Sequence, residues 1–150
     1  MARLNLLEET RFEKLPVSVY EKEEIASKIV AQRIASLIRE KAKHNKHAVL
    51  GLATGATPIK VYEELVRMHK EESLSFENVI TFNLDEYYPM QPDAKQSYVR
   101  FMDENLFNHI DIKRKNIHVP DGTLAKEDIT DYCLEYERKI TAVGGLDIQV

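Results

Sequence analysis

The stretch HAVLGLATGATPIKVY (residues 47–62) joins an apolar run to an amphipathic run through threonines, a glycine and a proline. HAVLGL, residues 47–52, is too short for a helix of its own, and its apolar character predicts a buried strand. Pro58 suits the first position of a helix, because its ring fixes φ near the helical value, and Thr57 is then the N-cap. The apolar residues that follow recur at helical spacing: Ile59, Tyr62, Leu65 and Val66.

Strands and helices alternate along the rest of the chain. Strands are predicted at residues 16–20, 79–84, 117–119 and 146–150, and helices at residues 22–42, from Ser97, and around Ile129 to Ile140, where Gly144-Gly145 ends the last helix. This alternation predicts an α/β domain, doubly wound around a largely parallel, Rossmann-like sheet. Residues 1–14 are polar and poorly patterned, so we interpret them as an N-terminal extension to a domain portion at 15–150. Because the chain ends on the first residues of a strand, we expect it to be truncated before the domain is complete.

Composition excludes several classes of protein. The formal net charge of −4 and the short, isolated basic clusters give no electrostatic basis for binding nucleic acid. The first residues lack the apolar core of a signal peptide, and no apolar run approaches the roughly 18 residues of a membrane span, so no membrane partner is expected. A single cysteine, Cys133, excludes an internal disulfide framework. We therefore expect a soluble, cytoplasmic protein.

The loop between the first strand and helix, Ala53–Thr57, has the composition of an anion site. The first turn of a helix carries backbone N–H groups without internal partners, and the helix dipole favours an anion there. Gly55 permits a positive φ, the small side chains of Ala53 and Ala56 allow a ligand to approach, and the hydroxyls of Thr54 and Thr57 can donate to oxygen. The same residues also suit a simple helix cap, and the pattern alone does not distinguish the two interpretations.

Asp85 follows the apolar run VITFNL, residues 79–84. In a right-handed strand–helix–strand unit the carboxyl ends of both strands share one edge of the sheet, so Asp85 is expected beside the Ala53–Thr57 loop. Next to a bound phosphosugar, this carboxylate could act as the general base on a C–H adjacent to a carbonyl. Alone it would fit a loop acid capping a turn. We interpret Glu86 as a supporting group behind Asp85, because successive residues point in different directions.

Other polar residues are weaker candidates. His44 and His47 lie three apart, but no third ligand accompanies them, so no metal site is expected. Cys133 shares a helical stripe with Ile129 and Tyr136, which favours core packing over a role as nucleophile.

Three motifs, in order, resemble the N-terminal half of glucosamine-6-phosphate deaminases, also called glucosamine-6-phosphate isomerases. They are GLATGATPIKVYEELVRMHK (residues 51–70), VITFNLDEYY (79–88) and SYVRFMDENLFNHIDI (97–112). The resemblance implies conversion of glucosamine 6-phosphate to fructose 6-phosphate and ammonia, in amino-sugar catabolism, without a metal or organic cofactor. It implies that residues 54–57 belong to the sugar-phosphate loop, and that Asp85 carries the proton between C2 and C1.

The sequence departs from the family pattern at two places. Ala56 stands where the family loop commonly has its second glycine, in T-G-G-T-P. The family's Gly-His-Ile-x-Phe-Asn-Glu stretch, which supplies the ring-opening histidine, is not present in these 150 residues, so we expect the chain to be inactive on its own. A 6-phosphogluconolactonase-like hydrolase and a non-catalytic phosphosugar-sensing domain are the alternatives; Asp85-Glu86-Tyr87 favours the deaminase. A homo-oligomer is expected, since the family often forms hexamers.

Overall fold

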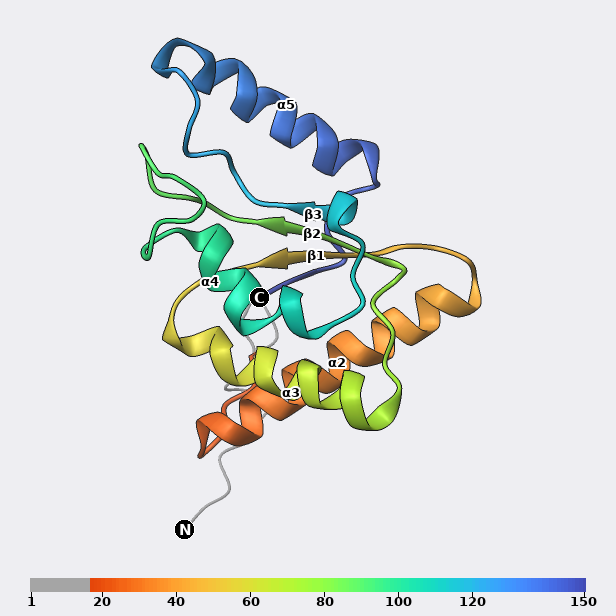
Figure 1. Cartoon of the computed structure of the whole chain (residues 1–150). Coiled ribbons are helices and arrows are strands. Elements are labelled where there is room, and N and C mark those ends of the chain that lie inside the picture. The colour runs from red at the N-terminus through yellow and green to blue at the C-terminus, as the bar shows by residue number, and fades with distance from the viewer. Residues whose placement is uncertain (1–16) are drawn as a thin grey trace, which may run out of the picture.

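A four-stranded parallel sheet forms the centre of the structure, a computed structural model that describes residues 17–150 (Figure 1). The strands are β1 (Ala48–Leu52), β2 (Val79–Asn83), β3 (Ile117–His118) and β4 (Ile148–Gln149), in the order β3-β2-β1-β4. All three pairings are parallel, and β1 and β2 pair along their whole length from Ala48 opposite Val79 to Leu52 opposite Asn83. The predicted α/β fold with a parallel sheet is confirmed.

Helices cover both faces of the sheet. Helices α2 (Glu23–Lys43), α3 (Ala56–Glu72) and α4 (Tyr98–Asn105) lie on one face, and α5 (Ile129–Ala142) lies on the other (Figure 1). Short 3-10 helices span Phe107–His109, Arg114–Asn116 and Lys126–Asp128. No helix in the part of the chain from residue 17 onward is both long and apolar enough to cross a membrane.

The main core lies between the sheet and the layer formed by α2, α3 and α4. Its fully buried side chains include Ile34 of α2, Leu50 of β1 and Leu65 of α3. The buried side of α2 also contains Ala31 and Ala35, and these small side chains allow close packing against α3. On the opposite face, α5 covers only a small cluster of strand residues with Tyr136 and Ile140.

The chain reverses its direction across the sheet between β1 and β4. From β1 the chain passes through α3 to β2 and then to β3, and α5 on the other face returns it to β4 beside β1. Asp147, just before β4, connects this edge strand to α2 and β1: its carboxylate accepts hydrogen bonds from Lys41 Nζ at 2.6 Å and from the Val49 amide at 2.9 Å. Partial burial acts to raise the pKa of Asp147, but these two hydrogen bonds outweigh it and lower the pKa. In open α/β sheets, ligands bind where the chain reverses its direction across the sheet, which here is between β1 and β4.

Two local predictions are wrong. Residues 17–20 form no strand, and Val17 and Val19 are 70% and 90% exposed, because the alternating pattern has no partner strand among residues 17–150; Pro16 lies outside the described residues. Helix α3 has Gly55 as its N-cap in place of Thr57 and begins at Ala56. The positive φ of Gly55 turns the chain into the helix early, and Pro58 still lies in the first turn, where its missing N–H has no intrahelical role.

Candidate functional site

The first part of the site is the Ala53–Thr57 loop, which begins where β1 ends. Gly55 has φ 111° and ψ 179°, a conformation that is essentially restricted to glycine, and a Cβ there would meet no atom within 4 Å. No side chain of the described residues caps α3, so its first amides, such as those of Ala56 and Thr57, have no protein partner in that role. The exposed residues Gly55, Ala56 and Thr57 thus surround a helix N-terminus that is open to an anion.

Tyr62, on α3, holds the first residue of this loop by a hydrogen bond. Its ring is fully buried on α3, and its hydroxyl donates to the carbonyl oxygen of Ala53 at 2.5 Å. Burial raises the pKa of Tyr62, so the hydroxyl keeps its proton at any physiological pH. The loop is therefore attached to its own helix by one side chain.

We expect Tyr62→Phe to lower the free energy of unfolding by about 1 kcal/mol, because the Ala53 carbonyl loses its donor while the ring stays packed. Urea unfolding at pH 7 measures this loss. Tyr20→Phe, at a residue that is 36% exposed, is the control and should leave the urea midpoint unchanged. An unchanged midpoint in Tyr62→Phe would show that the hydrogen bond does not stabilise the loop.

A hollow of about 480 Å³ lies beside the loop, at the reversal point of the sheet. Ala53, Thr54 and Thr57 line one side, and the end of β4, with Gln149 and Val150, lines another. The first turns of α2, from Glu23 to Val30, complete the wall. The small side chains of the loop leave the backbone within reach of this space.

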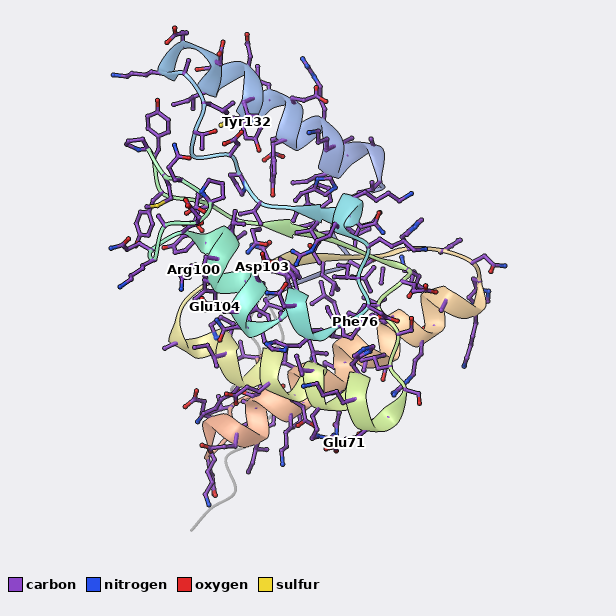
Figure 2. All side chains as sticks on the ribbon, in the orientation of Figure 1. Glu71, Phe76, Arg100, Asp103, Glu104 and Tyr132 are labelled. Carbon is purple, nitrogen blue, oxygen red and sulfur yellow. The ribbon has the colours of Figure 1, made fainter. Side chains whose placement is uncertain are left out.

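Asp85 lies past the end of β2, next to the strand that carries the loop. The amide of Leu84 donates to the carbonyl of Leu52 at 3.2 Å, so the two strands end side by side. The Asp85 side chain is exposed and lines a different hollow of about 290 Å³, between the segment after β2 and α5. Tyr132, on α5, borders the same hollow (Figure 2). The structure thus brings Asp85 and the loop to one edge of the sheet, but each lines its own hollow.

Glu86 also lines this hollow, and its carboxylate is hydrogen-bonded to the start of α4. Its carboxylate accepts hydrogen bonds from the amides of Tyr98 and Val99, at 2.9 and 3.2 Å, and from the Ser97 hydroxyl at 3.0 Å. The predicted helix that starts at Ser97 is α4, with Ser97 as its N-cap, and the Ser97 oxygen accepts from the Val99 and Arg100 amides. Glu86 therefore fixes the segment that carries Asp85 to the N-terminus of a helix.

Tyr136 supports the same segment from the other face of the sheet. Its hydroxyl lies 2.9 Å from the carbonyl oxygen of Asn83 and 3.0 Å from that of His118, and shares one proton between the ends of β2 and β3. Burial raises the pKa of Tyr136. The sequence placed Tyr136 on the inner side of a helix, but only the packing of α5 on the sheet reveals the two carbonyls that it contacts.

The prediction that Cys133 packs in the core is wrong. Its side chain is exposed and lines the Asp85 hollow, because α5 contacts the sheet through Tyr136 and Ile140 and leaves the side of Cys133 uncovered. Within residues 17–150, no cluster of three His, Cys, Asp or Glu side chains is arranged to hold a metal ion.

Comparison with known proteins gives one family for most of the chain. A family model described as glucosamine-6-phosphate isomerases/6-phosphogluconolactonase matches residues 21–150. A glucosamine-6-phosphate deaminase-like protein of Bacteroides thetaiotaomicron is 50% identical over 139 residues, which are 93% of this chain and 21% of that protein. The glucosamine-6-phosphate deaminase of Thermoanaerobacter sp. is 45% identical over 121 residues, which are 81% of this chain and 47% of that protein.

Comparison of the fold with solved structures leads to the same family. The solved structure of a monomeric glucosamine-6-phosphate deaminase superimposes with a TM-score of 0.82 at 39% identity, over 90% of this chain and 54% of that one. Because that relative is described as monomeric, it gives no support to the expected homo-oligomer. The chain spans about half the length of the Thermoanaerobacter deaminase and of the monomeric deaminase, and about a fifth of the longer Bacteroides protein. On its sequence and its fold, the chain belongs to the family of glucosamine-6-phosphate isomerases and 6-phosphogluconolactonases.

Proposed function

We propose that this chain supplies the phosphate-binding loop and the proton-transferring acid of a glucosamine-6-phosphate deaminase. The observation that carries the proposal is the uncapped N-terminus of α3, with Gly55 at φ 111°. This N-terminus follows β1, which pairs with β2, the strand that ends shortly before Asp85. Relatives named glucosamine-6-phosphate deaminase support the choice of reaction. A cytoplasmic location and a homo-oligomeric state remain predictions.

Each part has a defined role in the proposed reaction. The amides at the start of α3, with the hydroxyls of Thr54 and Thr57, bind the phosphate, because they present unpaired donors to its oxygens. Asp85 takes the proton from C2 of the open-chain amino sugar and returns it to C1, which yields the ketose imine whose hydrolysis releases ammonia. Glu86 holds the Asp85 segment by its hydrogen bonds to α4. Opening of the sugar ring needs a further acid–base group, which the resemblance assigns to a motif not present in residues 1–150.

An enzyme assay on the whole protein tests the proposal. We expect ammonia and fructose 6-phosphate from glucosamine 6-phosphate, no hydrolysis of 6-phosphogluconolactone, and no turnover by residues 1–150 alone. Lactone hydrolysis without ammonia release would assign the chain to the lactonase branch of the family. Hexose-phosphate binding without either reaction would assign it to a sensing role.

A further inference from the structure

Two buried polar side chains on β2 have no hydrogen-bond partner. Thr81 and Asn83 are 1% and 2% exposed, and neither the Thr81 hydroxyl nor the oxygen and nitrogen of the Asn83 carboxamide contacts a donor or acceptor among residues 17–150. Buried polar groups are nearly always paired, since an unpaired one loses its hydrogen bonds to water without replacement. A buried leucine would need no hydrogen-bond partner at this position, so the presence of an unpaired asparagine needs an explanation.

The position of Asn83 indicates its partner. Residues of β2 alternate between the faces, so Thr81 and Asn83 share with Val79 the face covered by α2, α3 and α4, while Ile80 and Phe82 face α5. Asn83 is also the last residue of β2 and pairs in register with Leu52, the last residue of β1. The chain leaves Leu52 as the Ala53–Thr57 loop and enters α3 on this same face. The Asn83 carboxamide therefore lies beneath the beginning of the loop.

The backbone of Asn83 is held independently of its side chain. The Asn83 carbonyl accepts from Tyr136 on the opposite face, and the next amide, that of Leu84, donates to Leu52. The side chain can thus form a hydrogen bond to a new partner without displacing the strand. The carbonyl of Ala53, in contrast, is already occupied by the Tyr62 hydroxyl.

We propose that Asn83 is a positioning residue for the sugar-phosphate loop: its carboxamide hydrogen-bonds the backbone of residues 53–57 when a phosphosugar is bound, and so orders the loop around the phosphate. The inference rests on the proposed function of that loop. It assigns to Asn83 an effect on substrate affinity, and it leaves proton transfer to Asp85.

The test compares Asn83→Leu with Thr81→Val in the whole protein. Both variants remove a buried, unpartnered polar group from the same face of the same strand, so neither should lower the melting temperature of the ligand-free protein. Asn83→Leu should raise the KM for glucosamine 6-phosphate about 5- to 10-fold with kcat within about twofold, the loss expected for one neutral hydrogen bond. Thr81→Val, one pleat further from the loop, should leave both constants unchanged.

A wild-type KM in Asn83→Leu would overturn the inference while the proposed function stands. A KM change of equal size in both variants would also overturn it, because the effect would then come from the core. If Asn83→Leu fails to fold, Asn83→Asp preserves the shape and places a carboxylate beneath the phosphate loop; a wild-type KM there overturns the inference as well. Absence of any response to glucosamine 6-phosphate in the wild-type protein would overturn the proposed function, and the inference with it.

Discussion

Asp85→Asn is expected to lower turnover of glucosamine 6-phosphate by the whole protein about 10²- to 10⁴-fold, with little change in KM. The carboxamide has nearly the shape of the carboxylate but cannot accept the C2 proton. The Asp85 side chain is exposed and makes no hydrogen bond to residues 17–150 that the substitution would remove, so the melting temperature should stay within about 1 °C of the wild type. Release of ammonia under saturating substrate measures the effect on kcat.

Glu137→Gln is the matched control for Asp85→Asn. Glu137 is a second exposed carboxylate that lines the same hollow, from α5, and the substitution removes the same charge. It should leave turnover within about twofold of the wild type, because surface charges act weakly through water. Near-wild-type turnover in Asp85→Asn, or an equal loss in both variants, would show that Asp85 is not the base.

Gly55→Ala is expected to raise the KM for the phosphosugar about 10-fold or more. At φ 111° and ψ 179°, an alanine carries about 1–3 kcal/mol of backbone strain, although its Cβ would meet no neighbouring atom. The loop relieves this strain by turning, which moves the amides of Ala56 and Thr57 that are proposed to bind phosphate. Steady-state kinetics and isothermal titration with glucosamine 6-phosphate measure the loss of affinity.

Gly145→Ala separates strain from binding. Gly145 also has a positive φ, of 85°, with open space around it, but it lies after α5 and does not line either hollow of the site. It should lower the free energy of unfolding by a similar amount and leave KM unchanged. An unchanged KM in Gly55→Ala, or an equal increase in Gly145→Ala, would contradict the assigned role of the loop.

The fold could be predicted from the sequence where a run of regularly spaced apolar residues was bounded by residues that typically begin or end a strand or helix. Residues 47–72 are the best example: the apolar run, the loop and the amphipathic run became β1 and α3 within a few residues. The prediction failed where tertiary neighbours decide. The alternation at Val17 and Val19 has no strand to pair with in the described part of the chain, and Cys133 is exposed because α5 contacts the sheet through its other residues. Such outcomes depend on packing partners, which local periodicity does not specify.

The arrangement of the candidate site was predictable only in part. Parallel strands and right-handed crossovers place the loop and Asp85 at the same sheet edge, and the register of Leu52 with Asn83 agrees with this. The sequence does not specify the direction in which each segment leaves the sheet. In Figure 1 the chain leaves β1 toward α3 and leaves β2 away from it, so the two groups line separate hollows. The support of the Asp85 segment by Glu86 and Tyr136 also arises only in three dimensions.

A crystal structure of the whole Asp85→Asn protein with glucosamine 6-phosphate tests the central claim most directly. The claim is that the loop after β1 and the acid after β2 act on one ligand. We predict a single bound sugar whose phosphate oxygens accept from the amides of residues 55–57, with the side chain of residue 85 near C2. A sugar phosphate that contacts only one of these two segments, or that binds elsewhere on the protein, would contradict the account.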